Sequence, residues 1–366
     1  MKFTVNTRAL RHVTDLGIIK ANISRFYPRS NVIQITADRD TLRLNIETSG
    51  IKTKMVLGGS GDDDTTVSVL VDCSVFKSLI NSIDAEVISL EFIDGGVYVH
   101  AGNSKFAIPK LLDVNDVQLD TPTEGYTAVS TVTINPANWQ FIKDHQMYAI
   151  ATSDNHPIYM NVWVGKDKEV IVGDFDSSLF TYSKQGDFDS TCLFPASIIN
   201  LLASIPSGST VSKIDKNYIL NISTDSYSMV TEFTPKYEED ESVGNYNSEI
   251  ILKMLQHPDS YITVDVAPIA KFLNQSAILR QSDLDKVIDF TISNGVLQLV
   301  NRASSCTIPV ETDASYAVKF SADFLKSVLA NLDAETINIA PMMRGDRPIG
   351  GIFWTDTLTT LLAGMG

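Results

Sequence analysis

The sequence predicts an α+β protein made of three repeated domains, in which each domain packs two helices on antiparallel sheets. The first observation is an apolar helical pattern that occurs three times, in SVFKSLINSID, ASIINLLASIP and ADFLKSVLANLD. The second is the order of elements, since each copy runs helix, strands, helix, strands. The third is size, because 366 residues exceed what one core supports while a third of them make an ordinary domain. We therefore expect domains at residues 1–122, 123–242 and 243–366.

The repeat is clearest in the second helix of each copy, where three apolar residues recur at the same spacing. These residues are Leu79, Ile80 and Ile83 in the first copy, Leu201, Leu202 and Ile205 in the second, and Val328, Leu329 and Leu332 in the third. A first helix is predicted upstream in each copy, within TRALRHVTDLGII, NPANWQFIKDHQMYAIA and VAPIAKFLNQSAIL. Strand-like runs such as VIQITADRDTLRLNIE lie between the two helices, and others such as VISLEFIDGGVYVHAG follow the second.

The first helices are expected to pack on a sheet by one face only. In the third copy, residues at i, i+3, i+4, i+7 and i+8 form the buried stripe, namely Ile269, Phe272, Leu273, Ser276 and Ala277. Lys271 and Gln275 point away from that stripe. Asn135 and Asp265, each followed by a proline within three residues, mark helix starts, because a capping side chain satisfies free backbone amides.

Charge argues at first against nucleic acid, because phosphate contacts come from lysine and arginine and the net charge is −15 with a pI near 4.7. The acidic runs at residues 62–64 and 238–241 are interpreted as solvated loops. The predicted helices instead carry cations, which are Arg8, Arg11, Lys77, Lys143, Lys271 and Lys326. Two interpretations remain open: the helices line a shared interior with these cations inward, or they are surface helices with ordinary lysines.

No motif for catalysis, cofactor binding or metal binding is found in the sequence. The five histidines are scattered, GGSGDDD lacks the lysine of a phosphate-binding loop, and GxSxG is absent. Cys73, Cys192 and Cys306 are too few and too far apart for a disulfide framework, which favours a reducing cytosol. No window is apolar enough for a membrane span, and MKFTVNTRALRHV lacks the apolar core of a secretory signal. We therefore expect a cytoplasmic protein without enzymatic activity, cofactor, metal or membrane contact.

Short matches along the chain give a specific resemblance. They are the opening MKFTV, the SKFAIPKL strand of the first copy, YMN and VGDFDSSLF of the second, and AIL at the end of the third copy's first helix. Together with three domains in 366 residues, they resemble the bacterial sliding clamp, the beta subunit of DNA polymerase III. The resemblance covers the whole chain at low identity.

The resemblance implies a DNA-clamp fold and a head-to-tail homodimer, whose similar domains close a ring around duplex DNA without reading its sequence. A ring of strand-paired domains leaves no open sheet edge. The implied dimer interface sets Phe106 and Ile108 of the first copy against Ile278 and Leu279 of the third, and the alternative for the strand residues is the core of their own domain. The helical cations named above would face the DNA channel, where weak contacts to phosphate permit sliding.

Clamps of this family also bind short peptides from the polymerase and the clamp loader, in an apolar pocket between the second and third domains. By residue matching, the implied pocket walls are Met160, Ser177, Ser178, Leu179, Leu252, Met254, Thr360 and Leu362. The sequence departs from the family here, because DFDSSL and the tail LLAGMG replace the usual residues. We therefore expect a different preferred peptide, and the alternative interpretation of these residues is domain-interface core. The departures also motivate the hypothesis of a phage replication system acting in an infected bacterium.

Two other functions stay open besides replication. A repeat-built structural or assembly scaffold, such as a virion protein, would share the helix and sheet pattern, and absence of a ring in solution would favour it. A hydrolase using Asp174 and Asp176 would need a base, nucleophile or metal set that the sequence does not provide. The favoured interpretation is a DNA sliding clamp, a processivity factor that tethers the replicative polymerase.

Overall fold

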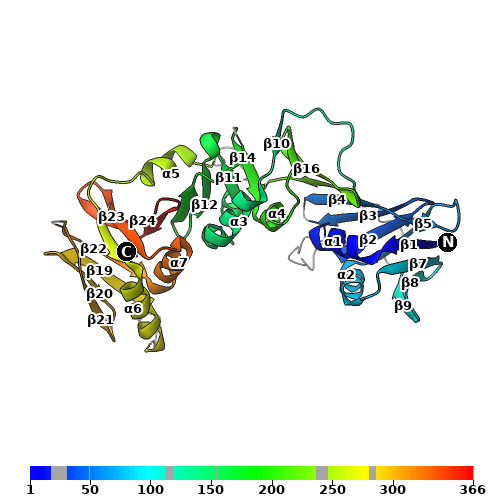
Figure 1. The fold of residues 1–366 in the computed structure, drawn as a ribbon. Helices are drawn as coiled ribbons and strands as arrows, with labels where there is room; N and C mark the ends of the chain where they lie inside the picture. Colours follow the sequence, from blue (N-terminus) through cyan, green and yellow to red (C-terminus); the bar gives the residue numbers. More distant parts are fainter. Residues whose placement is uncertain are drawn as a thin grey trace. The chain divides into compact units, whose positions relative to one another are not determined.

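The computed structural model describes residues 1–17, 31–48, 50–111, 119–153, 155–188, 190–235, 246–279, 286–312 and 314–365. The chain divides into two compact units (Figure 1). Unit 1 combines Met1–Gln140 with Ser197–Pro235, and unit 2 combines Phe141–Ala196 with Lys236–Gly366. Every strand pair between described residues is antiparallel, which confirms the predicted α+β class.

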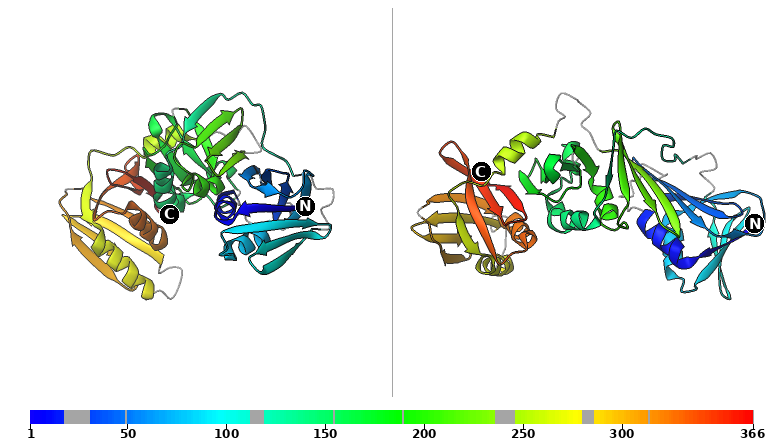
Figure 2. Two further views of the ribbon diagram at one scale, coloured as in Figure 1. Left: turned by 45° about the vertical axis from the view of Figure 1, so that its right-hand side comes forward. Right: turned by 45° about the horizontal axis from the view of Figure 1, so that its top comes forward.

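Unit 1 packs two helices against two sheets. The helices α1 (Thr7–Gly17) and α2 (Cys73–Ser82) lie side by side (Figures 1 and 2). The smaller sheet contains, in spatial order, β5 (Ser60–Gly61), β1 (Lys2–Asn6), β7 (Val87–Ile93), β8 (Gly96–Ala101) and β9 (Ser104–Pro109). The larger sheet contains β10 (Ser130–Thr133), β15 (Thr210–Ile214), β16 (Asn217–Ser223), β17 (Tyr227–Phe233), β4 (Ile51–Gly58), β3 (Thr41–Thr48), β2 (Val32–Ala37) and β6 (Val67–Asp72).

Unit 2 repeats this plan with the helices α6 (Val266–Ile278) and α7 (Ala322–Leu332), and it adds the short helix α5 (Ser248–Met254). Its larger sheet contains, in spatial order, β14 (Cys192–Pro195), β11 (Asn161–Val164), β12 (Val170–Asp174), β13 (Leu179–Ser183), β25 (Thr359–Ala363), β24 (Arg347–Trp354), β23 (Thr336–Arg344) and β18 (Ile262–Asp265). The smaller sheet contains β21 (Ser305–Pro309), β20 (Val296–Val300), β19 (Val287–Ser293) and β22 (Tyr316–Ser321). Short 3-10 turns are η3 (Met147–Ala149), η4 (Pro157–Met160) and η5 (Lys166–Lys168).

The two larger sheets explain why compact units do not coincide with the predicted repeats. β17 of the predicted second domain pairs with β4 of the first, and β13 of the second pairs with β25 of the third. The division between units falls within α3 (Pro136–His145) and α4 (Ala196–Leu202), the helices of the second copy. Because the sheets run across the predicted boundaries, those boundaries after residues 122 and 242 remain a prediction.

The helices bury the side chains that their periodicity selected. Among the repeated positions of the second helices, only Leu79 is partly exposed, and the other eight are buried. On α6 the stripe is buried except for Ala277, which is half-buried, while Lys271 and Gln275 are exposed. Asn135 Oδ1 accepts a hydrogen bond from the Ala137 amide at 3.2 Å, as expected of a helix start.

Other sequence expectations have mixed outcomes. α6 does begin after Asp265, but that side chain makes no capping hydrogen bond. The acidic residues 62–64 are exposed, whereas residues 238–241 lie outside the described part of the chain. Among the described residues, no helix has the length and apolar character needed to cross a membrane.

Candidate functional site

The cations on α1 and α2 differ in how they are engaged. Arg8 is exposed, whereas the half-buried Arg11 guanidinium donates a hydrogen bond to the backbone oxygen of Ile83 beyond α2. Lys77 Nζ on α2 lies 3.3 Å from Asp15 Oδ1 on α1. Part of the positive charge predicted to face DNA therefore links the two helices of unit 1 to each other.

A hollow of about 990 Å³ opens beside α1 within unit 1. Arg8 and Arg11 bring guanidinium groups to its wall, whereas Asp15 and Asp225 bring carboxylates. Attraction and repulsion of an incoming phosphate partly cancel in such a mixed-charge wall. This hollow can therefore offer an external phosphate only a weak net attraction.

The predicted cations of unit 2 are free of ion pairs with described residues. Lys271 on α6 and Lys326 on α7 are exposed, and these two helices pack against each other. Lys143 near the end of α3 is half-buried, and its neighbour His145 places Nδ1 3.0 Å from the backbone oxygen of Asn331 on α7. Helix packing within unit 2 thus presents three lysines that an external anion can contact.

The larger sheet of unit 2 has two different faces. We call the face covered by Ile251 of α5 and by Leu255, the residue that follows α5, the α5 face, and the opposite one, against which α7 packs, the α7 face. Phe180 on β13 and Leu361 on β25 are register partners, and both lie in the apolar cluster of the α5 face. A Cβ on Gly173, the β12 partner of Phe180, would overlap the Phe180 ring, so this close packing requires glycine there.

Aromatic side chains extend that cluster beyond the strands. The ring centroid of Tyr159 lies 4.9 Å from that of Tyr246 and 5.8 Å from that of Phe175, which is 53% exposed. Burial raises the pKa of the Tyr246 hydroxyl well above its ordinary value, so the group stays neutral. Sequence reasoning missed Tyr159, Tyr246 and Phe175, although the aromatic residues among the second copy's strands and at the start of the third copy were a usable signal.

The predicted peptide-pocket residues divide between the two faces. Met160, Leu252 and Met254 border the apolar cluster of the α5 face. Ser177 and Ser178 are half-buried in the turn between β12 and β13, where Ser178 has a positive φ of 49°. Met160, Leu252 and Met254 thus lie beside the α5 face, while Ser177 and Ser178 lie in the turn that joins β12 to β13.

The other three predicted residues, Leu179, Thr360 and Leu362, are not brought to that surface. Their exposures are 2%, 0% and 1%, and Thr360 Oγ1 lies 3.0 Å from the Tyr148 hydroxyl away from the α5 face. Strand side chains alternate between faces, so a shift of one residue moves a side chain to the opposite side. Phe180 and Leu361 hold the neighbouring positions on the α5 face.

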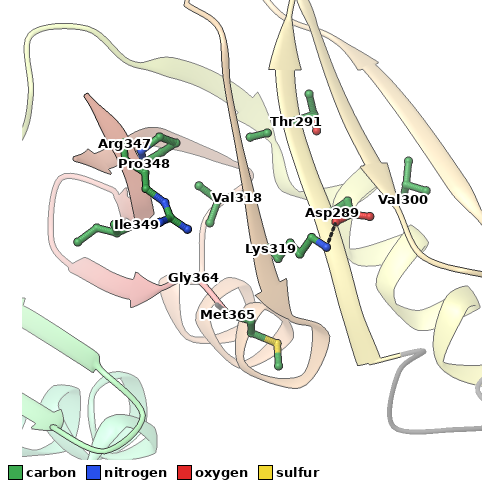
Figure 3. Close-up of a pocket in the computed structure, with 11 residues that line it drawn as sticks. Asp289, Thr291, Val300, Val318, Lys319, Arg347, Pro348, Ile349, Gly364 and Met365 are labelled. Carbon is green, nitrogen blue, oxygen red and sulfur yellow. Dashed lines mark ion pairs between the residues drawn. The ribbon is translucent and has the colours of Figure 1, made fainter. Parts of the chain in front are cut away.

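A hollow of about 640 Å³ lies where the carboxyl end of the chain passes β22 and β24 (Figure 3). The Met365 amide donates to the backbone oxygen of Lys319 at 2.7 Å, which fixes the end of the chain there. Lys319 Nζ lies 3.7 Å from Asp289 Oδ1, while Arg347 lines the same hollow. Arg347 is therefore a cation in this wall that has no carboxylate partner among the described residues.

The residues predicted for a dimer interface lie in two places, on strand β9 of unit 1 and at the end of helix α6 of unit 2. β9 is an edge strand of the smaller sheet of unit 1, and Phe106 on it is 39% exposed. Ile108 is only 2% exposed, so its side chain belongs to the core of unit 1, the alternative that the sequence left open. Ile278 and Leu279 at the end of α6 are 83% and 50% exposed.

The carboxylates considered for hydrolysis organise a turn. Asp174 Oδ1 accepts the Asp176 amide at 3.0 Å, and Asp176 Oδ2 accepts Asn155 Nδ2 at 3.0 Å. Across the described ranges, no group of three or more histidine, cysteine, aspartate or glutamate side chains is placed to hold a metal ion. Asp174 thus stabilises the turn itself, whereas Asp176 joins the turn to Asn155 and to His156, whose Nε2 lies 3.7 Å from Asp176 Oδ1.

Comparison with solved structures identifies the fold. The DNA polymerase III beta subunit of Thermotoga maritima has a TM-score of 0.78 at 13% identity, covering 100% of this chain and 99% of that one. The beta subunit of Pseudomonas aeruginosa has a TM-score of 0.75 at 16% identity, and the Helicobacter pylori beta clamp bound to a DNA ligase peptide has 0.69 at 13%, each with 100% of both chains covered. No protein-family model and no curated protein matches the chain. The chain therefore has the fold of these beta subunits.

Proposed function

We propose that the chain is a DNA sliding clamp, a replication processivity factor that encircles duplex DNA and tethers a polymerase. The observation that carries the proposal is the match of fold over the whole length of solved beta subunits. Helices with unpaired lysines on antiparallel sheets, without a catalytic or metal constellation among the described residues, support a binding function rather than an enzyme.

The ring would form from two copies that meet head to tail, each contributing the three predicted domains. The exposed backbone edge of β9 and the side chain of Phe106 supply one end, and Ile278 and Leu279 supply the other. Ile108 would contribute through its backbone on the edge strand. Joining such ends removes an open sheet edge and covers exposed apolar groups, which favours closure over aggregation.

Duplex DNA would be held in the ring by Arg8, Lys143, Lys271 and Lys326, with Arg11 and Lys77 contributing less because of their internal partners. Contacts to phosphate carry no base information, so binding is independent of sequence and permits sliding. The net charge of −15 repels DNA from the rest of the surface. Such a clamp acts in the cytoplasm of a bacterium or of a phage-infected cell.

Partner proteins would bind through short peptides, as the ligase peptide binds the Helicobacter pylori clamp. A polymerase and a clamp loader are the expected partners, and the proposed surface for them includes Met160, Leu252 and Met254 beside the α5 face, with Ser177 and Ser178 of the β12–β13 turn. The phage hypothesis predicts a changed preference. Micromolar binding of a typical bacterial clamp-binding peptide would count against it.

Sedimentation and electron microscopy test the ring. We expect a dimer with a central opening wide enough for duplex DNA. Combining Phe106→Asp with Ile278→Asp should leave monomers, because buried unpaired charge opposes association. The matched control is Val129→Asp, at a position that is 73% exposed and lies outside both β9 and α6. A wild-type particle without an opening would favour the structural-scaffold alternative.

A further inference from the structure

Residues 119–126 of unit 1 are bonded to four adjacent strands of its larger sheet, and we call this segment the strap. Thr123 joins it to β17. The bonds to the other strands run from Asp120 N to Glu47 Oε2 on β3 (3.1 Å), from Lys54 Nζ on β4 to Glu124 Oε1 (2.7 Å), and from Asn221 Nδ2 on β16 to the Tyr126 hydroxyl (2.8 Å). β3 and β4 belong to the predicted first domain, and β16 and β17 to the predicted second. The strap therefore spans the junction of these two domains.

The junction under the strap is a continuous strand pairing, which we call the seam. Every residue of β17, from Tyr227 to Phe233, has a register partner on β4. Within the seam, the buried hydroxyls of Thr53 and Thr231 lie 3.2 Å apart. Local opening of a strand pair is governed by the buried contacts around it, so the segment that covers the seam affects how readily it opens.

A buried carboxylate fastens the strap to the seam. Glu232 on β17, the register partner of Lys52, is 3% exposed. Its Oε2 accepts the Thr123 amide at 2.7 Å and the Thr123 hydroxyl at 2.9 Å, while Oε1 accepts Asn217 Nδ2 at 2.8 Å. Burial of a charge is tolerated only when hydrogen bonds compensate it, and hydrogen bonds to an ionised group are the strong ones. Release of the strap would deprive Glu232 of both Thr123 donors.

The remaining contacts of the strap are buried apolar ones and exposed ion pairs. Leu119 is 3% exposed and Pro122 is buried, so the bound strap also keeps apolar surface from water. The ion-paired carboxylates of Asp120 and Glu124, in contrast, have side-chain exposures of 61% and 75%. Exposed ion pairs contribute little to stability. Among the polar contacts, those of Glu232 therefore determine how firmly the strap is held.

We propose that the strap is a latch on the seam and that Glu232 is the positioning residue that keeps it closed. While Thr123 is bonded to Glu232, β4 and β17 stay covered and paired. Once the strap is released, water reaches the seam and the pairing opens locally. The consequence for a ring rests on the proposed function: a latched seam closes this junction as a route by which DNA could leave.

Amide hydrogen exchange of the full-length protein, measured by mass spectrometry, tests the latch. In Glu232→Gln we expect the strap and both strands of the seam to exchange about tenfold faster or more, because hydrogen bonds to a charged group are lost. Thr123→Val removes the hydroxyl and keeps the amide, so about threefold is expected. The double variant should exceed Glu232→Gln by no more than about twofold, since both changes remove one interaction.

Matched measurements separate the latch from general effects. Glu124→Gln removes the same charge from an exposed position of the strap and should leave exchange within about twofold of the wild type. The amides of β7 and β8, in the smaller sheet of unit 1, should exchange at the wild-type rate in every variant. If Glu232→Gln does not fold, Thr123→Val, at an exposed position, decides the question.

Two results would overturn the latch. One is faster exchange in the strap with wild-type exchange in β4 and β17, because the strap would then only cover the sheet. The other is an equal effect of Glu232→Gln and Glu124→Gln. On a nicked plasmid, Glu232→Gln should be lost faster than Glu124→Gln, and equal lifetimes would refute the role in the ring. Failure of the wild-type protein to stay on the plasmid would contradict the clamp, whereas hydrogen exchange decides the latch without a ring.

Discussion

Individual ion pairs determine how much of the positive charge on the helices can reach an outside phosphate. Lys77 lies 3.3 Å from Asp15, with side-chain exposures of 26% and 48%. A pair that is this exposed contributes little to stability, about 0 to 1 kcal/mol. Its larger consequence is electrostatic, because the carboxylate of Asp15 cancels much of the field of Lys77 at the surface of α1 and α2.

Replacing Asp15 with asparagine should release Lys77 toward DNA. We expect Asp15→Asn to tighten binding of linear duplex by about threefold at low salt, a gain that fades as salt screens the charges. Titration by fluorescence anisotropy measures it. Asp94→Asn removes the same charge in the exposed turn between β7 and β8, and an equal gain there would refute a local effect.

The lysines without ion pairs provide the converse prediction. Lys143→Glu combined with Lys271→Glu should abolish loading or retention on circular DNA, because both cations would face the channel. Thermal unfolding should stay close to that of the wild type, since neither side chain has an ion pair with a described residue. Lys166→Glu with Lys184→Glu changes the net charge equally at exposed sites outside these helices. Unchanged retention in the first variant would contradict the channel assignment.

Glu91 links two neighbours beside the edge strand β9. Hydrogen bonds from Lys105 and His100 lower the pKa of Glu91 from 4.5 to about 2. Because the folded value is the lower one, its contribution to stability is complete above about pH 4.5 and is lost as the pH falls toward 2. In Lys105→Ala, nuclear magnetic resonance titration should show the Glu91 pKa rising toward 4.5. An unchanged pKa would show that Lys105 is not its partner in solution.

Helices and strands differ in how far the sequence predicts them. The α6 stripe was predicted nearly residue by residue, because helix periodicity is a local property and Ile269, Phe272 and Leu273 follow it. The face of the sheet that Leu179, Thr360 and Leu362 occupy was not predicted. It depends on the pairing of β13 with β25, and these two strands are remote in sequence. LFTYS and TTLLA are apolar or neutral at nearly every position, so no alternation marks which residues face α5.

Two substitutions in the aromatic cluster of the α5 face should separate the effect of losing a buried ring from that of losing an exposed one. Phe180→Ala is expected to cost about 3 to 5 kcal/mol, because Phe180 is 4% exposed and its loss leaves a cavity. Phe175→Ala should cost far less, since that ring is 53% exposed and can be replaced by solvent. Urea unfolding of unit 2, followed by tryptophan fluorescence, measures both. Equal losses would contradict the packing described for the α5 face.

At the scale of the molecule, the proposed clamp would act by topology more than by affinity. The fold class could be read from the sequence, whereas the β-bulge between Met342 and Met343 and the placement of the short helix α5 on the sheet could not, because both depend on contacts between segments remote in sequence. A closed ring stays on circular DNA because the two are topologically linked, and it does not need to bind the DNA tightly. Retention on circular DNA should therefore persist at salt concentrations that abolish direct binding to linear duplex.

The central claim is that two copies enclose the double helix, and the most direct measurement is retention on a DNA circle before and after it is cut. Protein is loaded on a nicked plasmid, freed of unbound protein by gel filtration, and followed with and without a single-site endonuclease. The account predicts that the protein stays on the circle and runs off once the plasmid is linear. Equal retention on both forms, or equal loss from both, would contradict it.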